Sequence, residues 1–150
     1  MSNISADLIW ALNRSHNSFL VKRKEAGGVQ FSRDPLNLTN KHSRKQAGFA
    51  NEKAVGVQDS GNGGIVLVTK KTKTGLNKPA SNTNTVTFGK NTPTRKIYKG
   101  VATHVGKNGY RSDLLSDAVQ RTSAIRWSQK EKKEKAASKP RGAKAQKIEA

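Results

Sequence analysis

The sequence has no cysteine, few aromatic residues and no long hydrophobic run, and each shortage excludes a class of protein. Without cysteine the chain has neither disulfides nor thiolate zinc ligands, which excludes a disulfide-rich secreted scaffold. Its longest apolar runs, at 8–12 and 65–68, are only a few residues long, whereas a membrane-spanning helix needs about 20 consecutive apolar residues. We therefore expect a soluble intracellular protein that has no membrane partner.

Residues that build hydrophobic cores are also scarce. Leu, Ile, Val and Phe make up about 19% of the 150 residues, which is near the level at which highly charged chains stop folding unaided. The chain can therefore build one modest core, but not two.

Basic residues are the abundant class. There are 29 Lys and Arg against 10 Asp and Glu, so the formal net charge is +19 and the pI is about 10.6. Small soluble domains typically carry a net charge of about 2 to 8, and a larger excess of one sign makes the compact state repel itself. This balance predicts a polyanionic partner.

The N-terminal pattern predicts a short amphipathic helix. Ser5 is a suitable N-cap, and Leu8, Ile9 and Leu12 share one helical face, which favours a helix over residues 5–14. Because this region is almost free of charge, we expect it to belong to the core.

Strand-like runs follow in pairs. The runs 19–21 and 29–31 flank a Gly-Gly turn, and this arrangement predicts a hairpin with a basic tip. The runs 54–57 and 65–68 flank a turn rich in Gly, Asn and Ser and predict a second hairpin. Alternating residues near 86–88 indicate a further strand.

Two helical patterns come next, at residues 94–105 and 113–127. We expect Ser112 to cap the second helix, and Arg121 and Arg126 to project away from its apolar stripe.

These elements together predict an α+β fold. We expect a small antiparallel β-sheet with a short N-terminal helix and two C-terminal helices, plus extended basic loops and a tail. The α+β domain is expected to span residues 1–128. Residues 129–150 form a basic Lys/Glu-rich tail that we expect to be ordered only on a partner.

Catalytic and metal-binding patterns find no support. His16, His42 and His104 lie far apart, and no Asp or Glu follows at helical spacing, so we expect no metal and no cofactor. Acidic residues are mostly isolated among bases, which deprives a general acid/base pair of its setting. We therefore expect no enzymatic activity and no small-molecule substrate. His42 and His104 are expected to hydrogen bond to phosphate or base, and His16 to cap the first helix.

The basic clusters are the candidate RNA-binding residues, because a phosphate backbone rewards clustered cations by releasing counterions. Two aromatic residues that lie beside arginine, Tyr110 and Trp127, are added as candidates for base stacking, while Trp10, Phe19, Phe31, Phe49 and Phe88 are expected in the core. The candidates are Lys22, Arg23, Lys24, Lys41, His42, Arg44, Lys45, Lys70, Lys71, Lys73, Lys78, Arg95, Lys96, Lys99, Lys107, Tyr110, Arg111, Arg121, Arg126, Trp127 and Lys130.

Several fragments, in order, resemble one family. The opening Leu8-x-Trp10-x3-Arg14-x3-Ser18-Phe19-Leu20-x-Lys22-Arg23 is similar to that of the ribosomal L28e family, eukaryote-specific proteins of the large (60S) ribosomal subunit. Further matches are Asn37-Leu38, Gly48, the run 53–57, the strand 64–71, Lys78-Pro79, Tyr110-Arg111-x-Asp113-Leu114, Arg121 and Ser123-Ala124-Ile125.

This resemblance covers residues 1 to about 128, and it implies a structural protein of the cytosolic ribosome. Its implied partners are large-subunit ribosomal RNA and neighbouring ribosomal proteins, with no homo-oligomer. Its implied location is the cytoplasm, reached by way of the nucleus and nucleolus during assembly.

Two alternatives stay open. One is a trans-acting nucleolar assembly factor for the large subunit, since the Lys/Glu tail could engage another protein. The other is a general DNA-binding protein, although no helix-turn-helix spacing or basic leucine zipper is present.

Overall fold

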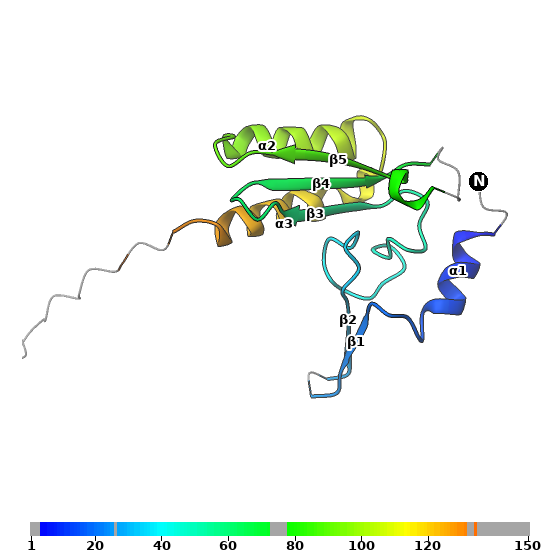
Figure 1. Cartoon of the computed structure of the whole chain (residues 1–150). Coiled ribbons are helices and arrows are strands. Elements are labelled where there is room, and N and C mark those ends of the chain that lie inside the picture. The colour runs from blue at the N-terminus through cyan, green and yellow to red at the C-terminus, as the bar shows by residue number, and fades with distance from the viewer. Residues whose placement is uncertain (1–3, 26, 73–77, 132–133, 135–150) are drawn as a thin grey trace, which may run out of the picture.

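The computed structural model describes residues 4–25, 27–72, 78–131 and 134, and it confirms the α+β class. Figure 1 shows the elements in chain order, which are α1 (Ala6–Asn13), β1 (Leu20–Arg23), β2 (Val29–Ser32), β3 (Val55–Asp59), β4 (Ile65–Lys70), a 3-10 turn η1 (Pro79–Ser81), β5 (Thr83–Phe88), α2 (Thr94–Ala102), a π-helical turn η2 (Thr103–Lys107), a 3-10 turn η3 (Ser112–Leu114) and α3 (Leu115–Ser128). No helix among these residues is both long and apolar enough to cross a membrane.

The strands form two antiparallel sheets rather than the single sheet expected. The larger sheet has the order β3-β4-β5. Strands β3 and β4 are the second predicted hairpin, and β5 is the predicted further strand. Val57 lies opposite Leu67, and Leu67 lies opposite Val86, so apolar residues of all three strands line one face. That face carries the core.

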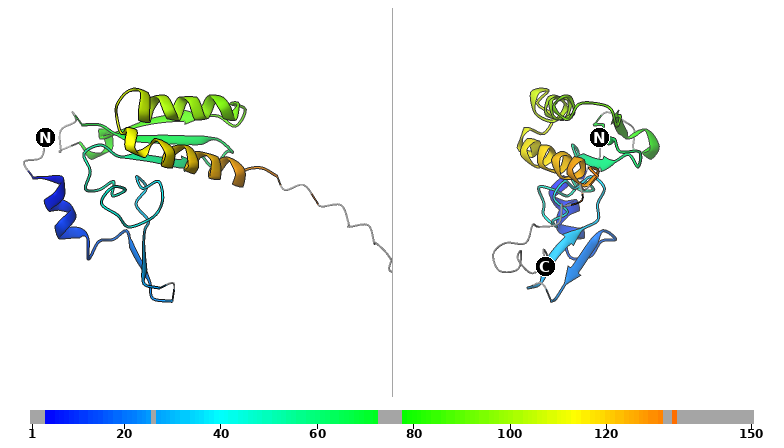
Figure 2. Two further views of the ribbon diagram at one scale, coloured as in Figure 1. Left: turned by 180° about the vertical axis from the view of Figure 1, so that it is seen from behind. Right: turned by 90° about the vertical axis from the view of Figure 1, so that its left-hand side faces the viewer.

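Helices α2 and α3 cover this apolar face side by side (Figures 1 and 2). Ile97, Val101 and Val105 follow one another at a spacing of four and are fully buried, as the helical pattern predicted. Leu114 and Ala118 meet them from α3 and the turn before it. The single modest core that composition allowed is this sheet-and-two-helix layer.

The opposite side of β3 is covered by the irregular segment 33–54. The two approach closely at Gly56, where a Cβ atom would lie only 2.4 Å from the Pro35 carbonyl oxygen. Side-chain bonds hold this segment together, because the buried Asp34 carboxylate accepts hydrogen bonds from the backbone N–H of Leu36 at 2.9 Å and of Phe49 at 3.2 Å. The segment therefore keeps its shape through side-chain hydrogen bonds to its own backbone.

The β1–β2 hairpin forms the second sheet and projects away from the core layer (Figure 1). Its register pairs Val21 with Phe31 and Arg23 with Val29. The expectation of a buried Phe31 was wrong: the residue is 38% exposed, because β2 belongs to the ribbon that projects from the core layer.

Helix α1 forms where it was predicted, with the Ser5 hydroxyl accepting the Leu8 N–H at 3.2 Å. Its assignment to the core was wrong, because Leu8 and Leu12 are exposed and no residue of α1 is buried. The helix instead turns Trp10 towards Phe49, with ring centroids 6.2 Å apart. Asn17, not His16, meets the end of the helix, where its side-chain amide donates to the Asn13 carbonyl at 3.0 Å.

The start of α3 also differs from expectation. Ser112 does not cap the helix, because residues 112–114 form a 3-10 turn and Asp113 is drawn to Arg111 instead. Arg121 and Arg126 were expected to project outward, but both are half-buried: Arg126 donates to the Gly63 carbonyl, and Arg121 lines a cavity together with residues of β3.

Candidate nucleic-acid interface

The tip of the β1–β2 hairpin carries the candidate cluster Lys22, Arg23 and Lys24, and all three side chains are exposed. Within the described ranges none of them makes an ion pair. Because strand residues alternate between faces, Lys22 and Arg23 point to opposite sides of the ribbon. The projecting ribbon therefore presents cations on both faces.

In the segment 41–45, the side chains divide between partners and solvent. The Arg44 guanidinium donates to Asp7 through Nη2 at 2.7 Å and Nε at 3.0 Å, and so ties the segment to α1. His42 Nε2 lies 2.8 Å from the Arg14 carbonyl oxygen, with its ring against Trp10. Lys45 lies 3.8 Å from an Asp117 oxygen, and Lys41 is exposed. His42 and Arg44 therefore make intramolecular contacts that position α1.

Arg111 is held by four hydrogen bonds inside the protein. Its guanidinium donates two hydrogen bonds of 2.7 Å to the Asp113 carboxylate. It also donates to the carbonyls of Lys53 at 2.9 Å and Lys45 at 3.1 Å. The two hydrogen bonds that the Asp113 carboxylate accepts from Arg111, and the positive charge of the guanidinium, lower the pKa of Asp113. The side chain thus joins the loop 45–53 to the start of α3.

Stability should depend on the charge of Asp113 in a defined direction. Folding lowers the pKa of Asp113. The carboxylate therefore adds to the free energy of unfolding above the unfolded-state pKa of about 3.9, and this stabilisation is lost as the pH falls through the folded-state pKa. The carboxylate is half-exposed, so we expect Asp113→Asn to cost less than about 1 kcal/mol at pH 6. Urea denaturation of both proteins should show this difference shrinking towards pH 3; a constant difference would contradict the assignment.

Lys70 and Tyr110 also make internal contacts. The Lys70 ammonium donates to the carbonyls of Asn51 at 3.0 Å and Gly48 at 3.3 Å, and burial lowers its pKa. The Tyr110 hydroxyl donates to the Lys70 carbonyl at 2.5 Å and accepts the Ala54 N–H at 3.1 Å, while burial raises its pKa. Tyr110 therefore bridges the ends of β3 and β4.

Replacing Tyr110 by phenylalanine should destabilise the fold by about 1–2 kcal/mol, because the Lys70 carbonyl and the Ala54 N–H then lose their partner. Urea denaturation measures the loss. Tyr98→Phe is the matched control, since the Tyr98 hydroxyl makes no hydrogen bond within the described ranges, and its effect should be near zero. Equal effects from the two substitutions would show that the Tyr110 hydroxyl does not brace the sheet.

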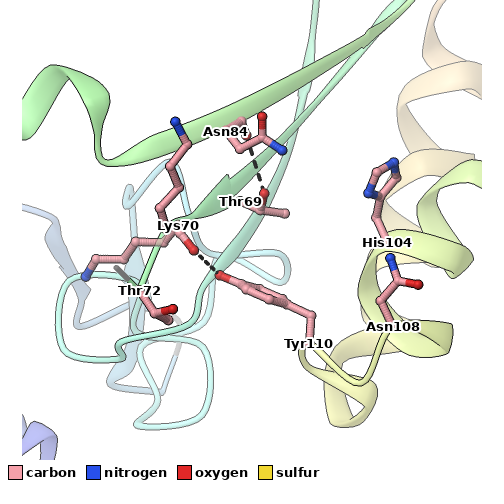
Figure 3. Close-up of a pocket in the computed structure, with 8 residues that line it drawn as sticks. Thr69, Lys70, Thr72, Asn84, His104, Asn108 and Tyr110 are labelled. Carbon is pink, nitrogen blue, oxygen red and sulfur yellow. Dashed lines mark hydrogen bonds between the residues drawn. The ribbon is translucent and has the colours of Figure 1, made fainter. Parts of the chain in front are cut away.

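A cavity of about 490 Å³ opens beside this bridge, between the ends of β4 and β5 and the turn η2 (Figure 3). His104 and Asn108 line it from the helical side, and Thr69 and Asn84 line it from the strands. Thr69 Oγ1 donates to the Asn84 carbonyl at 3.4 Å. Of the two histidines expected to contact phosphate or base, His104 lines this cavity and His42 does not.

The outer face of α2 holds a second exposed cluster. Ile97 and Val101 point into the core, which leaves Arg95, Lys96 and Lys99 exposed. Other candidates from the central part of the chain that are exposed are Lys71, Lys78 and Lys107.

The end of α3 combines an exposed ring with charge. Trp127 is 75% exposed, and the Lys130 ammonium lies 5.3 Å from its ring centroid. Arg126 is half-buried and donates to the Gly63 carbonyl at 2.9 Å. Trp127 is therefore accessible and remains a candidate for stacking on an RNA base. Arg126 instead joins α3 to the β3–β4 turn.

The structure thus shows that the side chains of several candidates, including Arg44, Lys70 and Arg111, are held by hydrogen bonds within the protein. Lys73 lies outside the described residues. Arg33 was not singled out from the sequence, because it is a single base outside the basic clusters, and the cavity that it lines is formed by residues distant in the chain.

Comparison with known proteins gives these cations a context. The model of the "Ribosomal L28e protein family" matches residues 8–128. The chain belongs to the ribosomal L28e family. It is 44% identical over 131 residues to the "Large ribosomal subunit protein eL28" of Schizosaccharomyces pombe, covering 87% of this chain and 97% of that protein. It is 35% identical over 117 residues to the protein of the same name from Trypanosoma cruzi, covering 78% of this chain and 73% of that protein. The resemblance seen in the sequence is confirmed.

Proposed function

We propose that this chain is a structural constituent of the large subunit of the cytosolic ribosome, where it binds ribosomal RNA. Membership of the L28e family and the names of its relatives support the subunit. The RNA-binding role rests on the exposed cations of the ribbon tip and of α2, which make no ion pairs within the described ranges.

The charge balance carries this proposal. The formal net charge is +19 after all ten acidic residues are counted, so 19 positive charges have no negative counterpart within the protein. A phosphate backbone supplies the missing negative charge and releases its own counterions on binding. In this role the protein neutralises phosphates and holds RNA segments and neighbouring proteins together, and we expect it to catalyse no reaction.

The exposed clusters lie on separate elements. The ribbon tip, formed by Lys22, Arg23 and Lys24, projects from one end of the domain, while the α2 cluster lies on the helical layer (Figure 1). A protein with cations on separate surfaces can contact more than one RNA segment, which suits a structural role.

Sedimentation of the tagged protein from cell extract through a sucrose gradient tests the proposal. A wash in roughly half-molar salt weakens binding that rests on charge alone. If the protein is a structural constituent, we expect it to comigrate after this wash with large subunits and with translating polysomes. Confinement to nuclear precursor particles would instead favour a nucleolar assembly factor. Release to the top of the gradient would show a loose association and contradict the structural role.

Competition between RNA and DNA tests the remaining alternative, a general DNA-binding protein. If the protein is built for ribosomal RNA, large-subunit RNA should displace a labelled RNA probe better than duplex DNA of equal phosphate concentration. Equal competition by DNA would indicate binding by charge alone.

A further inference from the structure

Arg121 differs from the other half-buried arginines of the described chain. Arg44, Arg111 and Arg126 each donate at least two side-chain hydrogen bonds to named acceptors. Arg121 makes no hydrogen bond or ion pair within the described ranges, and its Nε atom is buried without a partner. A buried polar group without a partner destabilises the fold, so an arginine that stays unpaired calls for an explanation.

The surroundings of Arg121 supply one. Arg121 lines a cavity of about 390 Å³ formed by α3, β3 and the start of the segment that follows β2. Arg33 and Asn40 line the same cavity, and the side chains of both lack hydrogen-bond partners among the described residues. The unengaged groups at this cavity therefore include two guanidinium groups and an amide.

The other polar walls of the cavity are already engaged. The Ser32 hydroxyl accepts the Asp34 N–H at 3.2 Å, and the Asn37 side chain donates to the Lys41 carbonyl at 2.9 Å and accepts the Thr39 N–H at 3.1 Å. The Asp34 carboxylate also lines the cavity, but its two oxygens accept the backbone N–H groups of the segment. Two arginines and one carboxylate leave the cavity with a net positive charge of one.

We propose that Arg121 and Arg33 together hold a single phosphate of the RNA backbone in this cavity. The inference rests on the proposed function and adds a site to it. Guanidinium groups suit a phosphate because their N–H donors match its oxygens in a planar fork. The amide of Asn40 adds one more donor, and the phosphate takes the place of the intramolecular partner that Arg121 lacks.

We call Arg121 and Arg33 together the phosphate clamp. Binding of the full-length chain to deproteinised large-subunit RNA from Schizosaccharomyces pombe tests this clamp. Filter binding between about 0.1 and 0.4 M KCl gives both the affinity and its salt slope. Arg121→Gln should weaken binding about tenfold and lower the slope by about one. Arg33→Gln should do the same. Because the two residues share one phosphate, the double variant should lose little beyond either single variant.

Arg126→Gln is the matched control, since Arg126 is half-buried on the same helix but bonded to the Gly63 carbonyl. It should lower the urea midpoint and leave the salt slope unchanged, whereas Arg121→Gln should not lower the urea midpoint, because it removes a buried group that has no partner. If Arg121→Gln fails to fold, Arg121 has a structural role and the clamp is overturned. Arg33 is exposed, so the Arg33→Gln variant should fold, and it tests RNA binding even if the Arg121→Gln variant does not fold.

Two other outcomes would also overturn the clamp. One is an unchanged slope in either single variant while the wild-type chain binds tightly. The other is an additive double variant whose slope falls by about two, which would mean two separate phosphates. Failure of the wild-type chain itself to bind large-subunit RNA would instead contradict the proposed function, so the two failures are distinguishable.

Discussion

Replacing Gly56 by alanine should destabilise the protein by about 3 kcal/mol, the upper part of the range for overpacking a tightly packed site. The new Cβ would lie 2.4 Å from the Pro35 carbonyl oxygen and 3.3 Å from the Leu36 Cα. Both are backbone atoms, so no side-chain rotation relieves the contact. Either β3 or the segment 33–54 must move, although Asp34 anchors that segment with two backbone hydrogen bonds.

Urea denaturation of the full-length chain measures this effect. Gly61→Ala is the matched control, because it also adds one methyl group but has no atom within 4 Å of the new Cβ. Gly61 has a φ of +78°, so its substitution should cost only about 1 kcal/mol through backbone strain. If the two variants were equally stable, the segment 33–54 would not be packed against the sheet as described.

Neutralising the ribbon tip should have the largest effect on RNA binding. The triple substitution Lys22→Gln, Arg23→Gln and Lys24→Gln removes three exposed charges that have no ion-pair partner among the described residues. We expect the salt slope to fall by about three and the affinity at 0.15 M salt to fall by about a hundredfold or more. Filter binding to large-subunit RNA measures both quantities.

A charge-preserving variant separates charge from shape. Lys22→Arg, Arg23→Lys and Lys24→Arg keep all three charges on the tip, and this protein should retain the wild-type slope. Both triple variants should keep the wild-type urea midpoint, because the altered side chains are exposed. A neutral tip that binds as tightly as the wild type would remove the ribbon from the RNA interface and leave the α2 cluster as the main candidate.

Local patterns in the sequence predicted most of the secondary structure. The spacing of Ile97, Val101 and Val105 predicted α2 and the helical turn η2 that follows it, and the Gly- and Asn-rich turn between two apolar runs predicted the β3–β4 hairpin. These elements follow from neighbouring residues, because a helix buries every third or fourth side chain and a strand buries every second one.

Two of the wrong predictions, for α1 and for Ser112, share a different cause. Leu8 and Leu12 have the pattern of a core helix, yet they are exposed because α1 packs through Trp10 on an irregular segment instead of on the sheet. Ser112 is a good N-cap by residue type, but Arg111 binds Asp113 and the chain makes a 3-10 turn there. In each case a contact with another side chain prevailed over the local preference.

Composition and order alone determined that this chain is basic, carries little core and resembles the ribosomal L28e family. They also determined where positive charge lies along the chain, because charge is a property of each residue. Only the tertiary structure decided which cations lie at the surface without an intramolecular partner. Arg111 donates to a carbonyl 66 residues away and the Lys70 ammonium to one 22 residues away, whereas Lys22 meets no such acceptor among the described residues. Hydrogen bonds act over about 3 Å, so the partner of each cation depends on how the folded chain brings distant backbone together.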